Sequence, residues 1–163
     1  LINNSDDAKR VVDSCKYPPI GKRGLFSTSR TGKYGITPIV DHVKTSNDEM
    51  FVAVQIETLD GINNQDSIIE TEGVDSVFLG PGDLSSVLGG HGQVTHEKVK
   101  NTMESMIPKI IKAGKIPGTL VADGDQAKYW NDRGINFLIG GANKFLLNGS
   151  KQFIDDVKSK TKS

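Results

Sequence analysis

Two carboxylates follow two β-favouring runs of the chain. Glu57 stands directly after the run 51–56, and Asp83 lies shortly beyond a second run, 76–79. In parallel α/β folds, reactive groups gather at the carboxyl ends of strands, where the loops converge. Carboxylate oxygens suit Mg²⁺ or Mn²⁺ and leave coordination positions for water and a chelating substrate. The spacing therefore indicates a divalent-metal site, and the alternative is that each acid only caps or neutralises its loop.

A glycine-containing turn carries the second acid. The segment 80–85 reads Gly-Pro-Gly-Asp-Leu-Ser and joins a turn to what resembles a helix start. Amide groups that are free at such a start attract anions, and Gly82 lets a ligand approach the backbone closely. A small carboxylate would fit there. The segment matches neither a dinucleotide-binding fingerprint nor a P-loop, so an ordinary capped turn is the alternative.

Gln55 is a polar residue inside the first apolar run. Strand alternation places it on the same side as Phe51 and Ala53. An amide in so apolar a strand needs a hydrogen-bond partner. A ligand is one candidate for that partner, and a buried structural group is the other.

The other reactive residue types give weaker signals. No two of His42, His91 and His96 have the spacing of a zinc site. We expect His42 to face solvent or a helix neighbour, and His91, the best catalytic candidate of the three, to lie on a flexible surface loop. Cys15 is expected to be a small apolar helix residue. For Arg23 we favour a structural role over anion binding.

Composition narrows the class of protein. The chain has 163 residues, which suits one domain, and 36% are hydrophobic, as in soluble globular domains. Lys plus Arg and Asp plus Glu are both 20, so the basic excess that a nucleic-acid partner requires is absent. A single cysteine cannot form an internal disulfide, and no apolar run is long enough to span a membrane. We therefore expect a cytoplasmic protein with no nucleic-acid or membrane partner.

The elements that must position the two acids form a repeated strand–helix pattern, which predicts a parallel sheet. Strands are expected at 51–56, 76–79, 119–122 and 137–140, the first buried on both faces. Helices are expected at 63–72, 95–113, around 127–129 and at 143–157, with a frayed tail at 158–163. The inward-facing residues predicted for these helices are Ile68, Ile69, Val99, Met103, Met106, Ile107, Ile110 and Ile111.

Upstream of residue 51 we expect one helix, at 6–14, capped by Asn4 or Ser5. Leu1 and Ile2 resemble the end of a strand. The stretch 17–36 is rich in Pro, Gly, Ser and Thr and is long for a connecting loop.

Four strand–helix units do not close a barrel. An eight-stranded barrel takes about 250 residues, and an open four-stranded parallel sheet has a bare edge on each side. We therefore expect α/β architecture of the (β/α)8 TIM-barrel type, represented by the later part of the barrel with its N-terminal strands missing. The chain 1–163 is then a single partial barrel domain.

At these residues the sequence resembles the HpcH/HpaI aldolase family, which comprises pyruvate-dependent, metal-requiring class II aldolases related to the citrate lyase beta subunit. The matching motifs are Tyr17-Pro18-Pro19 with Gly21 and Arg23-Gly24, Gln55-Ile56-Glu57-Thr58, Gly73-Val74-Asp75 leading into the segment 80–85, and Gly114-Lys115. They occur in the family's order, and the chain beyond Lys115 matches only in its strand–helix pattern.

The resemblance implies a role for each candidate residue. Glu57 and Asp83 match the two metal-ligating carboxylates, and Gln55 matches a glutamine that contacts the substrate. Gly82 matches the small residue whose backbone binds the substrate, and Asp83 is expected at the same substrate-binding position. The implied cofactor is Mg²⁺, Mn²⁺ or Co²⁺. The implied reaction cleaves a 4-hydroxy-2-oxo acid to pyruvate and an aldehyde. On this basis Gln55→Ala is expected to spare metal affinity and to weaken pyruvate or oxalate binding.

The resemblance also implies what the chain lacks. The family's general-base histidine, the acid that tunes it and the arginine that stabilises the enolate fall before the point that matches Leu1, so no catalytic residue is expected in this chain. A catalytically inactive fragment or pseudoenzyme that keeps the metal and 2-oxo acid pocket is one alternative. A citryl- or malyl-CoA lyase is another. A homo-oligomer is expected, with an aldehyde pocket that involves the loop 24–36 and a neighbouring subunit.

Overall fold

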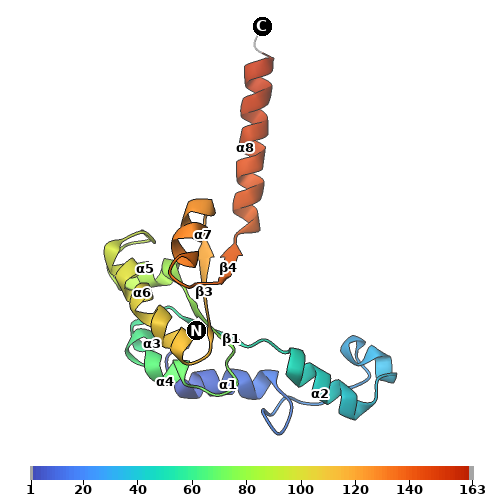
Figure 1. Ribbon diagram of the computed structural model, residues 1–163. Helices are drawn as coiled ribbons and strands as arrows, with labels where there is room; N and C mark the ends of the chain where they lie inside the picture. Colours follow the sequence, from blue (N-terminus) through green and yellow to red (C-terminus); the bar gives the residue numbers. More distant parts are fainter. Residues whose placement is uncertain (1, 162–163) are drawn as a thin grey trace.

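A four-stranded parallel sheet lies at the centre of the molecule (Figure 1). The computed structural model describes residues 2–161. The strands are β1 (Ala53–Ile56), β2 (Ser76–Leu79), β3 (Ile116–Val121) and β4 (Phe137–Gly140), and they lie side by side in chain order. The predicted strand–helix pattern and parallel sheet are confirmed, with β3 starting earlier than expected.

Eight α-helices and one 3-10 helix of the described residues surround or extend from the sheet. They are α1 (Ser5–Cys15), η1 (Arg30–Gly35), α2 (Ile39–Glu49), α3 (Leu59–Asn63), α4 (Gln65–Ile69), α5 (Pro81–Val87), α6 (Glu97–Lys112), α7 (Gly124–Asn131) and α8 (Ala142–Lys160). The side chain of Asn4 caps α1 by accepting a hydrogen bond from the Asp7 amide. Asn4 is one of the two residues predicted as the cap. Figure 1 shows α1 and α3–α7 gathered on one side, while α2 and α8 extend away.

The expectation of a single helix before β1 is wrong, because α2 is a second one. Its one buried residue is His42. Its apolar residues, Ile39, Val40 and Val43, lie only in its first half, so the helical periodicity is short. The 3-10 helix η1 lies within the stretch that was predicted to be a loop.

The single helix expected at 63–72 is also wrong. Two short helices, α3 and α4, occupy this region and are separated at Asn64, whose φ of −100° and ψ of 12° are not helical. Ile68 and Ile69 are buried as predicted. Gly73 has a φ of +81° and lies in the turn that leads to β2.

The hydrophobic core lies between the sheet and the helices that cover it. Val54 and Ile56 of β1 point into it, and α6 contributes most of the helical side chains. The buried members include Val54, Ile56, Val77, Leu79, Leu84, Val99, Met103, Met106, Ile107, Ile110 and Ile135. Of the predicted inward positions only Ile111 is wrong, since its side chain is 49% exposed.

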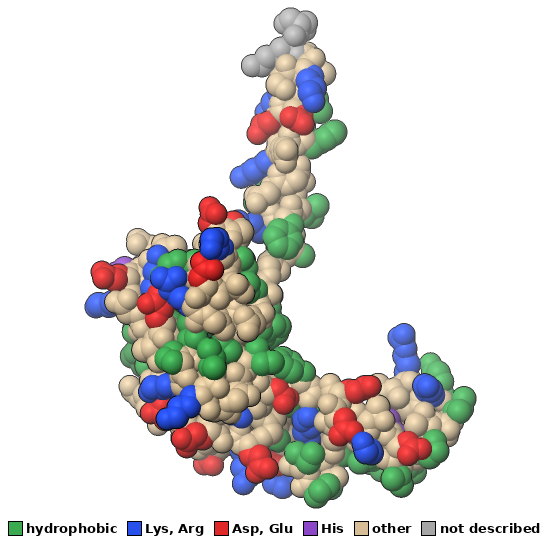
Figure 2. Space-filling model, viewed as in Figure 1, with side chains coloured by type: hydrophobic (Ala, Val, Ile, Leu, Met, Phe, Trp, Pro, Cys, Tyr) green, Lys and Arg blue, Asp and Glu red, His purple; other side chains and the backbone are tan. Residues whose placement is uncertain are grey.

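The other face of the sheet is open, so the expectation that the first strand is buried on both faces is wrong. Ala53 is exposed, and Phe51 is 47% exposed. Three rings form a row on this face, from Phe51 before β1, Phe78 of β2 and Phe137 of β4. The centroids of Phe51 and Phe137 are 5.6 Å apart, and those of Phe78 and Phe137 are 6.0 Å apart. Hydrophobic side chains are visible along this inner curve of the molecule in Figure 2.

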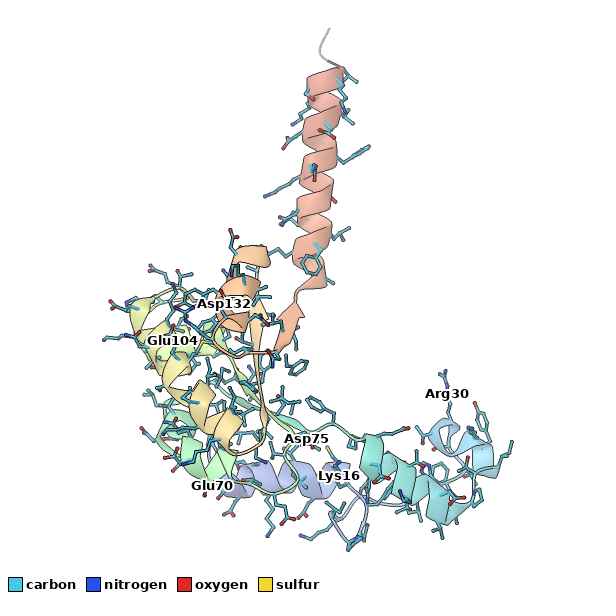
Figure 3. The ribbon with its side chains drawn as sticks, viewed as in Figure 1. Lys16, Arg30, Glu70, Asp75, Glu104 and Asp132 are labelled. Carbon is cyan, nitrogen blue, oxygen red and sulfur yellow. The ribbon has the colours of Figure 1, made fainter. Side chains whose placement is uncertain are left out.

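Partly buried hydrogen bonds from two side chains, Asp75 and Lys16, fix the amino-terminal end of β1 (Figure 3). The Asp75 carboxylate accepts a hydrogen bond of 2.7 Å from the Val52 amide. The Lys16 ammonium donates to the carbonyl oxygens of Asn47 and Met50, at 2.8 Å and 2.5 Å. These contacts hold the segment that enters β1 between α1, α2 and the start of β2.

Helix α8 extends from the end of β4 and buries none of its side chains (Figure 1). It continues to Lys160, beyond the helix end expected at 157, while positions 162 and 163 of the predicted tail lie outside the described residues. At the other end of the chain, Leu1 of the predicted strand end also lies outside the described residues. Ile2 is buried but belongs to no strand. Among the residues that the structure describes, no helix is both long and apolar enough to cross a membrane.

Thr119 gives a test of the tie between β2 and β3. Its hydroxyl is buried and donates a hydrogen bond of 2.9 Å to the Leu79 carbonyl. We expect Thr119→Val to lower the free energy of unfolding by about 1–3 kcal/mol, because a buried carbonyl loses its partner. Urea denaturation measures this change. Thr95→Val, at an exposed threonine, is the control and is expected to stay within about 0.5 kcal/mol.

Candidate functional site

The carboxyl ends of β1 and β2 bring the predicted site residues to one edge of the sheet. Ile56 pairs in register with Leu79, and the Gly80 amide donates a hydrogen bond of 3.1 Å to the Ile56 carbonyl. Glu57 and Gly80 therefore lie beside each other as the next residues of their strands. Asp83 follows on the first turn of α5.

Gln55 contacts the acid that follows it. Its Nε2 donates a hydrogen bond of 2.5 Å to Oε2 of Glu57. Both side chains lie on the open face of the sheet, because they are two residues apart on one strand. The partner that the Gln55 amide requires is thus the neighbouring carboxylate, and both side chains are half-buried.

Asp83 is close enough to Glu57 to affect its ionisation. The pKa of Glu57 is raised above its usual value, first by partial burial and then by Asp83, which acts through a side-chain hydrogen bond and through its like charge. The hydrogen bond from Gln55 opposes this rise, since it favours the carboxylate. The two acids therefore behave as an interacting pair.

A hydrogen bond from a buried serine stabilises the turn that carries Asp83. Ser85 is buried, and its hydroxyl donates a hydrogen bond of 2.6 Å to the Gly82 carbonyl. Gly82 itself is exposed, and nothing lies within 4 Å of where a Cβ would stand. A ligand can therefore reach the Gly82 backbone from the open side.

A hydrogen-bond network also fixes the loop after β1. The Thr58 hydroxyl donates to Oδ1 of Asn3 at 2.6 Å and accepts from the Gly61 amide at 3.0 Å. Nδ2 of Asn64 donates to the Asn3 carbonyl at 2.8 Å. Sequence reasoning missed Asn3, because its partners are far away in the chain and nothing local marks the contact.

The histidines lie away from this edge. His42 is buried, with its ring centroid 5.8 Å from that of Tyr17, so the expectation that it faces solvent or a helix neighbour is wrong. His91 is exposed in a turn with a φ of 45°. His96 precedes α6 and accepts a hydrogen bond from the Lys98 amide.

The other two candidates have structural surroundings. The Arg23 guanidinium stacks over the Tyr17 ring at 4.7 Å from its centroid, which agrees with the structural role favoured for it. Cys15 is the last residue of α1 and packs partly buried against the core, as expected of a small apolar helix residue.

The donor set fits a divalent cation. Within residues 2–161 no group of three or more His, Cys, Asp and Glu gathers as a ready-made cage. Glu57 and Asp83 nevertheless offer carboxylate oxygens, the ligand type of Mg²⁺ and Mn²⁺. The like charges that raise the pKa of Glu57 are the charges that a cation would neutralise. Solvent and substrate oxygens would complete the coordination.

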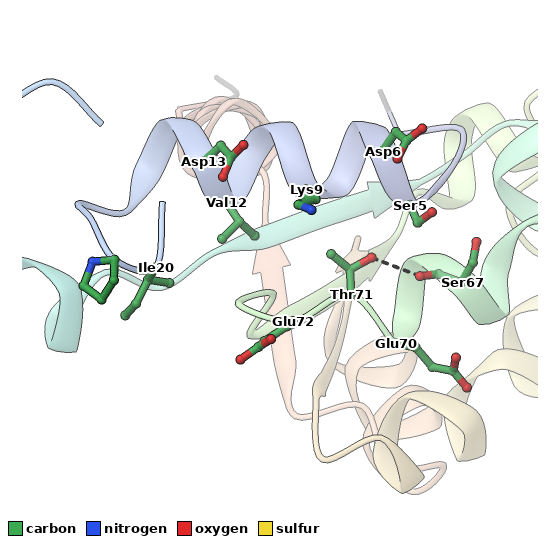
Figure 4. Close-up of a pocket in the computed structure, with 11 residues that line it drawn as sticks. Ser5, Asp6, Lys9, Val12, Asp13, Ile20, Ser67, Glu70, Thr71 and Glu72 are labelled. Atoms are coloured by element: carbon green, nitrogen blue, oxygen red, sulfur yellow. Dashed lines mark hydrogen bonds between the residues drawn. The ribbon is translucent and has the colours of Figure 1, made fainter. Parts of the chain in front are cut away.

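A hollow of the described surface lies away from this edge. It has a volume of about 660 Å³ and is bounded by α1 and by the end of α4 with the turn that follows (Figure 4). Its lining includes Asp6, Asp13, Glu70 and Glu72, with Lys9 among them. None of the predicted site residues lines it, so volume alone does not mark the site.

Parallel strand–helix units with acids at the carboxyl edge of the sheet are the architecture of a (β/α)-barrel enzyme. Residues 1–148 match the family of HpcH/HpaI aldolases and citrate lyases, and the chain belongs to this family. The family predicted from the motifs is confirmed.

Curated relatives carry the name of one activity. The chain is 38% identical over 148 residues to the 4-hydroxy-2-oxo-heptane-1,7-dioate aldolase of Shigella flexneri. The aligned region covers 90% of this chain and 55% of that protein. The protein of the same name from Salmonella paratyphi C is also 38% identical over 148 residues. The chain thus spans about half the length of the curated relatives that it matches.

Solved structures share the fold. An HpcH/HpaI aldolase/citrate lyase family protein from Burkholderia cenocepacia superposes with a TM-score of 0.89 at 28% identity, over 97% of this chain and 63% of that one. The HpcH/HpaI aldolase of Desulfitobacterium hafniense gives a TM-score of 0.85 at 28% identity, over 96% and 61%. These neighbours are TIM barrels, so the predicted partial barrel is confirmed.

The acid pair predicts a pH-dependent stability difference between the natural chain and Glu57→Gln. An acid whose pKa is raised on folding contributes stability below its unfolded pKa and loses that contribution as the pH rises through the raised value. Relative to Glu57→Gln, the natural metal-free chain should therefore lose stability between acid and neutral pH.

Urea denaturation across this pH range measures the difference. Glu72→Gln, at an exposed side chain outside the site, is the control for the substitution itself. If the difference between the natural chain and Glu57→Gln does not change with pH, the two acids do not interact as described.

Proposed function

We propose that Glu57 and Asp83 hold a divalent metal at which a 2-oxo acid binds. On this basis the protein is a metal-dependent class II aldolase that cleaves a 4-hydroxy-2-oxo acid to pyruvate and an aldehyde. The observation that carries the proposal is the meeting of Gln55, Glu57 and Asp83 at the carboxyl edge of the sheet. The names of the 38% identical relatives support the substrate class.

Each residue has a separate task in this proposal. A bound divalent metal, Mg²⁺, Mn²⁺ or Co²⁺, would supply Lewis acidity toward the negative charge that develops as the carbon–carbon bond breaks. Gln55 uses one N–H on Glu57 and keeps its other N–H and its carbonyl oxygen for the substrate. The exposed backbone at Gly82 receives the substrate carboxylate.

Proton transfer is the task that these residues do not perform. The three histidines of the described residues lie on α2, in the turn after α5 and before α6, and the hydrogen bonds of His42 and His96 join them to Tyr17 and Lys98. General acid–base catalysis contributes about 10²–10⁴-fold to a rate. We therefore propose that these residues bind metal and 2-oxo acid but turn over slowly by themselves, and the homo-oligomer implied by the resemblance stays a prediction.

Metal binding tests the assignment of the acids. Glu57→Ala and Asp83→Ala are each expected to abolish Mn²⁺ binding, because removing one of two charged ligands leaves too few to displace water from a hard cation. Isothermal titration calorimetry measures the affinity, and thermal denaturation checks that each variant folds. Asp125→Ala, at an exposed acid on α7, is the matched control. Native affinity in both site variants would reject the assignment.

Ligand binding and turnover test the reaction class. Oxalate and pyruvate should bind only in the presence of Mn²⁺, and condensation of pyruvate with an aldehyde panel should run at least about 10²-fold slower than in the Shigella flexneri relative. Absence of metal-dependent binding would reject the proposed function. Turnover at the rate of the relative would show that a proton-transfer group lies among these residues.

A further inference from the structure

We infer that Gln55 and Gly80 are positioning residues that set the Glu57 carboxylate against Asp83. This inference rests on the proposed function, because it concerns the same pair of acids. It assigns to Gln55 a task beyond substrate contact, and to Gly80 a steric task that the sequence motif does not reveal.

The first observation is the hydrogen bond between Gln55 of β1 and Glu57, the residue that follows this strand. Nε2 of Gln55 donates to Oε2 of Glu57 at 2.5 Å. Gln55 pairs in register with Phe78, whose ring lies 6.0 Å from that of Phe137. Gln55 therefore lies beside Phe78 in the sheet, and its amide donates to one oxygen of the Glu57 carboxylate. The other oxygen remains for the cation.

The second observation is the space left by a missing side chain. A Cβ at position 80 would lie 2.5 Å from Nε2 of Gln55 and 2.9 Å from Oε2 of Glu57, both closer than real Cβ contacts. The hydrogen-bonded pair therefore occupies the volume that any other residue at this position would fill.

The Gly80 backbone is not free to retreat from such a clash. Its amide donates to the Ile56 carbonyl at 3.1 Å, and its carbonyl accepts from the Leu84 amide at 3.0 Å. The preceding carbonyl, of Leu79, is held by the buried Thr119 hydroxyl. An added methyl group would consequently displace the side chains of Gln55 and Glu57 rather than the backbone.

The effect of an alanine at position 80 is therefore steric. Gly80 has a φ of −86° and a ψ of 90°, a conformation that residues with a side chain also adopt. Helix α5 begins at the residue after Gly80 and carries Asp83. The position of the Gly80 backbone therefore affects the positions of both Glu57 and Asp83. One glycine thus fixes the separation of the two carboxylates.

The inference changes the expected behaviour of Gln55→Ala. If Gln55 only contacted substrate, its loss would spare metal affinity. A positioning role predicts instead that Gln55→Ala and Gly80→Ala both weaken Mn²⁺ binding by about 10–100-fold, the usual effect of losing a group that orients a metal ligand. Calorimetric titration of Mn²⁺ measures both.

The double variant separates positioning from a general loss of structure. In Gly80→Ala with Gln55→Ala, the added methyl group enters space that the amide has left, so the combined loss of affinity should be smaller than the product of the single losses. Gly124→Ala is the matched glycine control, since nothing lies within 4 Å of a Cβ there, and it should bind Mn²⁺ as the natural chain does. Electron paramagnetic resonance of bound Mn²⁺ should change in the single variants.

The outcomes distinguish this inference from the proposed function. Failure of the natural chain to bind Mn²⁺, or native affinity in Glu57→Ala, would overturn both. If the natural chain binds, Glu57→Ala does not, and Gln55→Ala and Gly80→Ala keep native affinity, the positioning inference alone is overturned. Should Gly80→Ala fail to fold, Gln55→Ala decides the question, because it removes atoms and adds no clash.

Discussion

The parallel register between β1 and β2 is the constraint on which the rest of the site depends. It sets Glu57 beside Gly80 at the point where both strands end. Asp75 fixes the other end of the pairing through the Val52 amide, and Thr119 ties the Leu79 carbonyl to β3. A slip of one residue would turn Glu57 toward the hydrophobic core. The acids are thus placed by strand pairing rather than by the loops that carry them.

This placement has an electrostatic cost. The partial burial of Glu57 and the like charge of the exposed Asp83 raise the pKa of Glu57 and lower the stability of the ionised, metal-free state. Gln55 offsets part of this cost by donating to the carboxylate. Such an arrangement is typical of a site whose partner is a cation, because the same repulsion becomes attraction once a positive charge lies between the acids.

Sequence reasoning located the strands and the acids because continuous apolar runs and the residues that end them are local signals. It could not see that one face of β1 is open, since an apolar run has the same pattern whether a helix or nothing covers its second face. It missed α2 because the apolar residues of this helix lie only in its first half. The contact between Gln55 and Glu57 was also beyond it, because alternation gives the side of a strand but not the hydrogen-bond partner.

Helix α8 has a different relation to the rest of the chain. It buries no side chain, whereas α6 places five in the core. A helix that buries no side chain is held mainly by its own backbone hydrogen bonds, which open by fraying and reclose independently of the core. Its amide protons should therefore exchange with solvent far faster than those of α6, and loss of this helix should leave the cooperative melting of the sheet unchanged.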